Sequence, residues 1–245
     1  MFIRLVLLAL IVLTNIIQFH LLPAGMSKRV YMVLTRFFTS VLNLRMTIHG
    51  SPESMRGKNI IIMSNHYDGL LDAFTLYQLY YQHNQVETLW TVVKATILSD
   101  PEDTHILMKL LAPLKKAFIR SSYFLPYKRG DKEDGLRVQE TIGTSGRNIL
   151  VFPEGTTRKN GIPKDFKHGI FHVAINHGLR ILPVTVKFAK DIGCEKGEQM
   201  NPCNFFGNTV DVFIHDIVDP AGETAAGLKE KVFHRICAPM LQAQG

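Results

Sequence analysis

The stretch NIIIMSNHYDGLLDAF, residues 59 to 74, contains two patterns that together decide the fold. Residues 59 to 64 form a short apolar run rich in isoleucine, which is typical of a buried β-strand. After Asp68-Gly69 the pattern changes to one expected for a helix over residues 70 to 82, and Asp68 suits its N-cap. A strand that leads through a short loop into a helix is the repeating unit of an α/β sheet.

The same alternation continues along the chain. Further strands are predicted for runs bounded by polar or turn residues, at 88 to 93, 148 to 152, 181 to 186 and 209 to 218. Further helices are predicted at 104 to 115, 133 to 146, 168 to 178 and 223 to 243. The predicted fold class is therefore α/β, with a mixed, largely parallel sheet flanked by helices and functional sites at the carboxyl ends of its strands.

Length and composition restrict the class of protein. A chain of 245 residues can bury one full core, so a single domain with an extension is expected. The formal net charge of +7 favours anionic partners such as nucleic acid, phospholipid headgroups or phosphorylated substrates. No nucleic-acid reading module is recognisable, so lipid is favoured and no nucleic-acid partner is expected. Cys194, Cys203 and Cys237 lack metal-binding spacing, which predicts reduced thiols and no metal site.

The N-terminal segment is strongly apolar. Residues 5 to 22, LVLLALIVLTNIIQFHLL, include no Asp, Glu, Lys or Arg, and their number is at the lower end of what spans a bilayer as a helix. We expect a retained transmembrane anchor; an interfacial or buried helix and a cleaved signal peptide are the alternatives. Residues 30 to 44 predict a second helix, either in the headgroup region or packed in a core.

The charges that flank this segment predict its orientation. Lys28, Arg29 and Arg36 follow the apolar run, whereas Arg4 precedes it, so the positive-inside rule places the rest of the chain on the cytoplasmic face of a membrane. We therefore divide the chain into an N-terminal membrane-associated helical segment with anchor and interfacial helix, residues 1 to 45, and one larger domain, residues 46 to 245.

His66 follows the predicted strand and is close in sequence to two carboxylates, Asp68 and Asp72. A carboxylate that binds one imidazole nitrogen fixes the tautomer, so that the other nitrogen can take a proton from a hydroxyl. Asp68, as the N-cap, would bind helix amides, whereas Asp72 lies in the first turn and its side chain would lean back toward the loop. Asp72 is thus the predicted partner of His66. The alternatives are that Asp68 holds the imidazole, or that the histidine is only structural.

A second polar motif, FPEGTTR at residues 152 to 158, follows the strand predicted at 148 to 152. The amides around Gly155, the hydroxyls of Thr156 and Thr157 and the guanidinium of Arg158 are suitable phosphate ligands. An ordinary surface turn is the competing interpretation, because Pro and Gly are frequent in turns.

Residues 114 to 135 interleave basic residues with apolar and aromatic ones. Such a segment is suited to an amphiphile with a phosphate and an apolar tail, or else it is the solvated side of an amphipathic face. The basic residues are Lys115, Lys116, Arg120, Lys128 and Arg129.

Together these motifs resemble the PlsC-like glycerophospholipid acyltransferases, which include the 1-acylglycerol-3-phosphate acyltransferases. The resemblance extends from about residue 59 to 188 and rests on the Asn-His pair followed by a carboxylate, an Arg-bearing segment, FPEGTTR and ILPVTV. It implies that His66 is the general base and Asp72 its partner. It also implies that the phosphate of the acceptor is bound by Arg129, Glu154, Gly155 and Thr156. A fourth, proline-containing block of the family would correspond to Pro183.

The sequence departs from the family pattern in two places. The family usually separates its histidine and aspartate by four residues, whereas Tyr67 to Leu71 make five here. Its second block usually reads Phe-Ile-Asp-Arg, and the candidates here are FIR ending at Arg120 and PYKR ending at Arg129. Arg129 is preferred, because Arg120 lies 34 residues before Glu154.

The resemblance implies an O-acyltransferase of phospholipid biosynthesis that works at a membrane. It would move a fatty acyl group from acyl-CoA or acyl carrier protein to the free hydroxyl of a lysophospholipid, with 1-acylglycerol-3-phosphate as the favoured acceptor and phosphatidate as the product. The transfer would be direct, with membrane phospholipids as partners and no cofactor besides the thioester co-substrate.

Three other functions compete with this one. The first is transfer to another lysolipid or to an aminolipid acceptor, and the second is a non-catalytic lipid-binding relative in which the extra residue moves Asp72 away from His66. The third is a hydrolase, which is disfavoured because no G-x-S-x-G nucleophile elbow is present.

Overall fold

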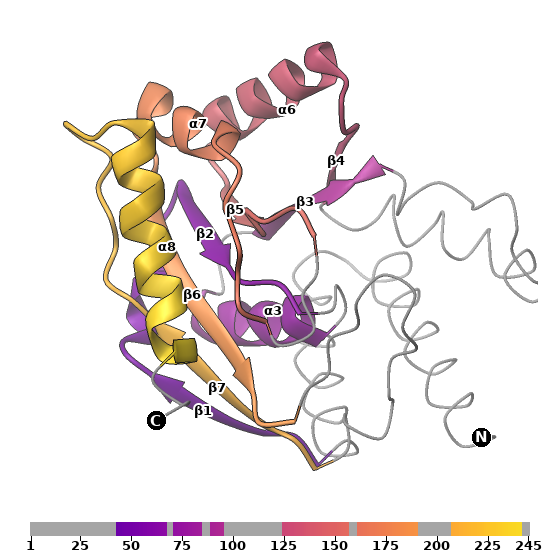
Figure 1. The fold of residues 1–245 in the computed structure, drawn as a ribbon, viewed down its shortest axis with the longest axis vertical. Coiled ribbons are helices and arrows are strands. Elements are labelled where there is room, and N and C mark those ends of the chain that lie inside the picture. Colours follow the sequence, from indigo (N-terminus) through magenta and orange to yellow (C-terminus); the bar gives the residue numbers. More distant parts are fainter. Residues whose placement is uncertain are drawn as a thin grey trace, which may run out of the picture.

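The computed structural model describes residues 43–67, 71–84, 89–95, 124–156, 161–190 and 207–241. In these ranges the chain forms a seven-stranded sheet that is parallel from β6 to β4, whereas β7 is antiparallel to β6 and β1 is parallel to β7 (Figure 1). In sheet order the strands are β1 (Arg45–His49), β7 (Thr209–Ile214), β6 (Arg180–Phe188), β2 (Ile60–Ser64), β5 (Asn148–Val151), β3 (Leu89–Lys94) and β4 (Phe124–Tyr127).

Helices cover both faces of the sheet. The reason is visible in β2, all five residues of which are buried, so that successive side chains need a partner on each side. One face packs on α3, and the opposite face packs on α6, α7 and α8. The helical segments are η1 (Pro52–Arg56), α3 (Leu71–His83), α6 (Lys132–Thr144), α7 (Gly169–His177) and α8 (Ala225–Leu241).

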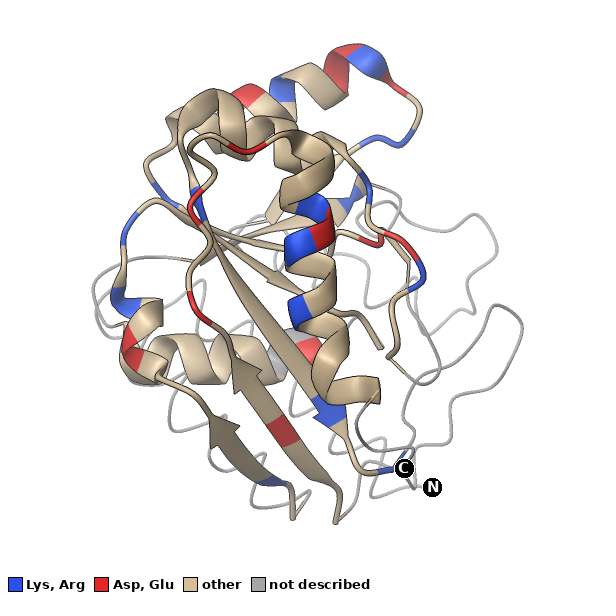
Figure 2. Ribbon diagram, turned by 60° about the vertical axis from the view of Figure 1, so that its left-hand side comes forward, with Lys and Arg blue, Asp and Glu red and all other residues tan. Residues whose placement is uncertain are grey.

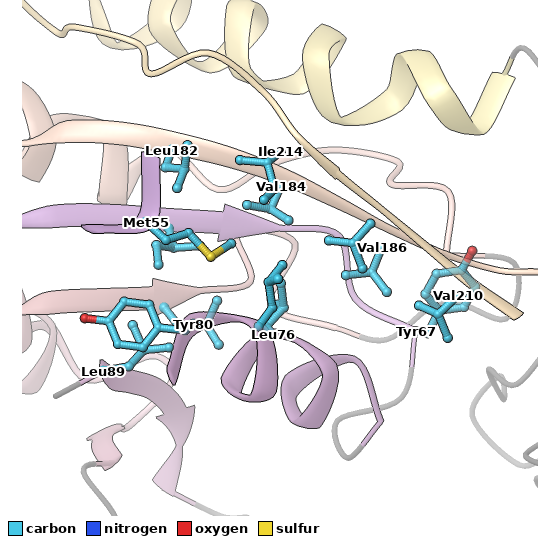
Figure 3. Close-up of a cluster of buried hydrophobic side chains, with 14 of the residues drawn as sticks. Met55, Tyr67, Leu76, Tyr80, Leu89, Leu182, Val184, Val186, Val210 and Ile214 are labelled. Atoms are coloured by element: carbon cyan, nitrogen blue, oxygen red, sulfur yellow. The ribbon is translucent and has the colours of Figure 1, made fainter. Parts of the chain in front are cut away.

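The core on the α3 face combines residues far apart in sequence. Leu76 and Tyr80 of α3 lie beneath β2 and β6, and Met55 of η1 packs in the same cluster, close to β2 (Figure 3). The charged residues in Figure 2 lie mainly on helices and in loops, and the central strands β2 and β5 have none. The interior is thus largely apolar, and its central strands β2 and β5 carry no charge.

The α/β fold with a mixed, largely parallel sheet is confirmed, and the five predicted strands and the helices near 70, 133, 168 and 223 are present. Sequence reasoning missed both edge strands. β1 is mostly exposed and lacks an apolar run, whereas β4 contains Pro126, which is tolerated only where a backbone donor is not needed. The strand predicted to reach residue 218 ends at Ile214, and Val218 makes only an isolated bridge to Ile181.

Two predicted segments lie outside the described residues: the helix at 104 to 115, and residues 1 to 42 with the predicted anchor and most of the second helix. In the part of the chain that the structure does describe, no helix is long and apolar enough to cross a membrane.

The side chain of Asn148, at the start of β5, fixes β2 and β5 relative to each other. Its Oδ1 accepts a hydrogen bond from the Ile60 amide (3.0 Å), and its Nδ2 donates to the carbonyl of Gly57 and to the Tyr80 hydroxyl, each at 2.7 Å. Asn148, Ile60 and Tyr80 are fully buried, so water cannot replace Asn148 at the Ile60 amide or at the Tyr80 hydroxyl.

We expect Asn148→Ala to lower the free energy of unfolding by about 3 kcal/mol, because it leaves buried polar groups unpaired. Urea unfolding followed by circular dichroism measures the loss. Asn176→Ala is the matched control, since Asn176 is an exposed asparagine on α7 and alanine is a good helix former. Equal stability of the two variants would contradict the role of Asn148.

Candidate functional site

The candidate site lies at the carboxyl ends of four neighbouring parallel strands, β2, β5, β3 and β4. Because Met63 of β2 is opposite Val151 of β5, the residues that follow these two strands come side by side. His66 follows β2, and Phe152 follows β5. This is the place where ligands bind in open parallel sheets.

His66 is paired with Asp72. Its Nδ1 lies 2.7 Å from Oδ2 of Asp72, and the amide of Tyr67 donates to the same oxygen at 2.9 Å. Asp72 is in the first turn of α3 and fully buried, whereas the His66 side chain is 15% exposed. A buried carboxylate next to Nδ1 favours the tautomer with the proton on Nδ1, so Nε2 is left as the acceptor.

The extra residue between His66 and Asp72 does not separate them, because helix α3 starts at Leu71 and turns Asp72 back toward the loop. The distance of 2.7 Å is a hydrogen-bond length, well below the separation of about 4 Å that would favour a non-catalytic relative. Within the described residues, Nε2 of His66 makes no hydrogen bond. Asp68, the other candidate partner, lies outside the described residues.

Two residues of the FPEGTTR motif also hold His66. Oε1 of Glu154 accepts a hydrogen bond from the His66 amide at 3.0 Å, and the ring of Phe152 stacks on the imidazole with 4.0 Å between centroids and 19° between planes. Glu154 is buried, and its carboxylate binds the main chain of the loop that carries His66. The resemblance suggested a contact of Glu154 with phosphate; the contact observed here is with the main chain of His66.

The residues on either side of His66 fasten it to the same motif. Asn65 acts as an extension of β2, since its amide group both donates to and accepts from the backbone of Val186 in β6, each at 2.8 Å. Its Nδ2 also donates to the carbonyl of Gly161 at 3.1 Å. Gly161 has φ of +68°, and a Cβ there would be 2.1 Å from the ring of Tyr67. Residues 65, 66 and 67 therefore each contact the segment from 152 to 161.

The turn after β5 leaves fewer amides for an anion than the sequence suggested. Gly155 has φ of +64°, and its N–H is already bonded to the Phe152 carbonyl at 3.0 Å. Thr156 is exposed on the surface of the turn. Thr157 and Arg158 lie outside the described residues, and Pro183 is within β6, opposite Met63.

A cavity of about 320 Å³ opens beside this turn. Arg129, in the loop after β4, is among its lining residues, and its Nη2 lies 3.8 Å from where a Cβ on Gly155 would be. Two further cations line it that sequence reasoning did not single out: Lys94 at the end of β3 and Lys167, whose amide donates to the Pro153 carbonyl at 2.8 Å. The walls are largely apolar, formed by Val92, Val93, Val138, Ile142, Val151, Phe152 and Ile170.

The described lining of this cavity is positively charged. No Asp or Glu is among its described lining residues, and the carboxylate nearest in sequence to Lys167, Asp165, has its pKa lowered chiefly by a hydrogen bond from Lys229, with a smaller contribution from the charge of Lys167. Three positive charges beside apolar walls suit an anionic head with an apolar tail. The only sequence signal for Lys94 and Lys167 was their position, at the end of one strand and just before a helix.

Cys237 of α8 is a free, buried cysteine near Glu154. Burial, together with the negative charge of the Glu154 carboxylate, raises the pKa of the Cys237 thiol to about 11. The thiol therefore stays protonated at neutral pH and is a poor nucleophile. No cluster of three His, Cys, Asp or Glu side chains that could hold a metal ion occurs among the residues described.

Residues 45–187 match the family model described as Acyltransferase. The chain is 24% identical over 185 residues to a 1-acyl-sn-glycerol-3-phosphate acyltransferase of Borreliella burgdorferi, which covers 72% of this chain and 62% of that protein. It is 37% identical over 59 residues to the human 1-acyl-sn-glycerol-3-phosphate acyltransferase alpha, which covers 24% of this chain and 21% of the human one. The matches thus span less than two thirds of either relative.

The fold is shared with a solved structure. The crystal structure of the 1-acyl-sn-glycerophosphate (LPA) acyltransferase PlsC from Thermotoga maritima superposes with a TM-score of 0.65 at 18% identity, covering 93% of this chain and 86% of that chain.

The tight fit of Tyr67 on Gly161 can be tested by adding one methyl group. We expect Gly161→Ala to destabilise the protein by about 2 kcal/mol more than Gly146→Ala, because both glycines have positive φ but only Gly161 faces a ring. A Cβ on Gly146 meets nothing within 4 Å, so that variant reports the backbone strain alone. Thermal unfolding of the two variants measures the difference, and equal melting temperatures would contradict the contact.

Proposed function

The chain belongs to the acyltransferase family, and we propose that it transfers a fatty acyl group from an acyl-thioester to the free hydroxyl of a lysophospholipid. The observation that carries this proposal is the His66–Asp72 pair at the strand ends, next to an apolar cavity with a positively charged lining. The acceptor that we favour is 1-acylglycerol-3-phosphate, with phosphatidate as the product.

The proposed reaction uses His66 as the general base. Nε2 of His66 takes the proton of the acceptor hydroxyl as its oxygen attacks the carbonyl carbon of the thioester. A tetrahedral intermediate forms, the carbon–sulfur bond breaks, and the imidazolium returns its proton to the departing thiolate. Asp72 supports the imidazolium in between, and such base catalysis contributes a factor of about 10² to 10⁴.

The charges of the cavity support a phosphate-bearing acceptor. Arg129 supplies a guanidinium that can bind two phosphate oxygens at once, and Lys94 and Lys167 add positive charge from two other segments. The apolar walls suit the glycerol backbone and the start of the acyl chain. Thr156, at the surface of the turn, is the other predicted phosphate ligand that the structure describes. We assign Glu154 a different role, which is to bind the main chain of the loop that carries His66.

The donor and the location also belong to the proposal. The thioester would come from acyl-CoA or acyl carrier protein, and the step needs no other cofactor. Because the acceptor is a membrane lipid and residues 5 to 22 are apolar, we propose that the protein works at a membrane, with its larger domain on the cytoplasmic face.

Removing the base should abolish transfer without unfolding the protein. We expect His66→Ala to lower the rate of labelled phosphatidate formation from acyl-CoA and lysophosphatidate by at least about 10²-fold, and Asp72→Asn to lower it by a smaller factor. The chain contains a matched control in His49, which is paired with Asp211 at 3.0 Å but lies on edge strand β1. Acyl transfer that survives His66→Ala, or that is lost equally in His49→Ala, would contradict this mechanism.

The headgroup preference tests the cationic cavity. We expect Arg129→Ala to raise KM for lysophosphatidate by about 10- to 100-fold, because a charge-assisted hydrogen bond contributes roughly 1.5–3 kcal/mol. KM for an uncharged monoacylglycerol should stay unchanged. Lys132→Ala, which removes an exposed cation outside the cavity, is the control. An equal loss with both acceptors would argue against phosphate recognition by Arg129.

A further inference from the structure

Phe152 contacts both parts of the candidate site. It follows β5 directly and is half-buried, with its ring stacked on the imidazole of His66 at 4.0 Å between centroids. The same residue lines the cavity that contains Arg129. Phe152 thus contacts the base and also belongs to the lining of the cavity.

The stacking supplies a restraint that the hydrogen bonds of His66 do not. The bond from Nδ1 to Asp72 fixes one point of the ring, and the bond from the amide to Glu154 fixes the main chain. Neither bond prevents the imidazole from tilting about the Nδ1–Asp72 direction. A flat apolar surface at 19° to the imidazole restricts this tilt and so sets the direction in which Nε2 points.

We propose that Phe152 is a positioning residue: it fixes the imidazole plane of His66 and forms the wall past which an acceptor in the cavity presents its hydroxyl to Nε2. This inference rests on the proposed function for its kinetic part only. Its structural part, that the Phe152 ring lies on the imidazole of His66, can be measured in the resting protein.

The chain contains a second arrangement of the same residue types. His49 is paired with Asp211 at 3.0 Å and stacks on Phe213, with 4.3 Å between ring centroids and 10° between planes. His49 lies on β1, and Asp211 and Phe213 lie on β7. The side chain of His49 is 44% exposed, and none of the three residues lines the cavity. Phe213→Leu is therefore a matched control for Phe152→Leu.

The first measurement is nuclear magnetic resonance of the full chain in lipid nanodiscs, with ¹³C at the Cε1 position of histidine. His66→Ala and His49→Ala assign the two signals, and a ring stacked face to face shifts a proton signal upfield. We expect Phe152→Leu to move only the His66 signal downfield, Phe213→Leu to move only the His49 signal, and Phe152→Tyr to leave both in place. A His66 signal that stays in place in Phe152→Leu overturns the proposal.

The second measurement is steady-state kinetics on the same proteins. We expect Phe152→Leu to lower kcat by about tenfold, with KM for the acyl donor within twofold of wild type, and Phe152→Tyr to restore kcat. Phe213→Leu should keep the wild-type kcat. A kcat of Phe152→Leu within twofold of wild type overturns the positioning role. Wild-type protein that transfers no acyl group overturns the proposed function instead, and the His66 signal still decides whether Phe152 stacks on the imidazole.

Discussion

The candidate site depends on one carboxylate oxygen, Oδ2 of Asp72, which is shared by the imidazole of His66 and the amide of Tyr67. Asp72 is fully buried, and a buried carboxylate is tolerated only when hydrogen bonds replace the water it has lost. Both partners lie in the loop between β2 and α3, so the start of the helix, the path of the loop and the orientation of the base are determined together.

The second constraint is that β2 and β5 are neighbours in a parallel sheet. Their carboxyl ends bring the loop with His66 next to the FPEGTTR motif, although the two are almost ninety positions apart in sequence. Polar contacts of Asn65 and Glu154 and the rings of Tyr67 and Phe152 then join the two segments. A cationic cavity lies directly beside this junction, because β3 and β4 end at the same edge of the sheet.

Local rules were enough to predict much of this arrangement. Apolar runs of fixed length predicted the central strands, and the backward lean of helical side chains indicated Asp72 as the carboxylate nearest His66. Those rules could not predict contacts that arise from sheet order. The stack of Phe152 on His66, the amide of Asn65 continuing β2 alongside Val186, and Lys94 and Lys167 in one cavity all join segments distant in sequence. Edge strand β1 was missed because its exposure removes the apolar run on which the prediction relied, and β4 was missed because Pro126 argues against a strand.

The fastening of residues 65 to 67 to the segment from 152 to 161 also determines how the site can fluctuate. If the loop after β2 opened by itself, the hydrogen bonds from Asn65 to Gly161 and from His66 to Glu154 would break. The imidazole of His66 would also leave the ring of Phe152, and the ring of Tyr67 would leave Gly161. Motions of lower cost must move both loops together. We therefore expect the base and the turn beside the cavity to exchange their amide hydrogens as one cooperative unit.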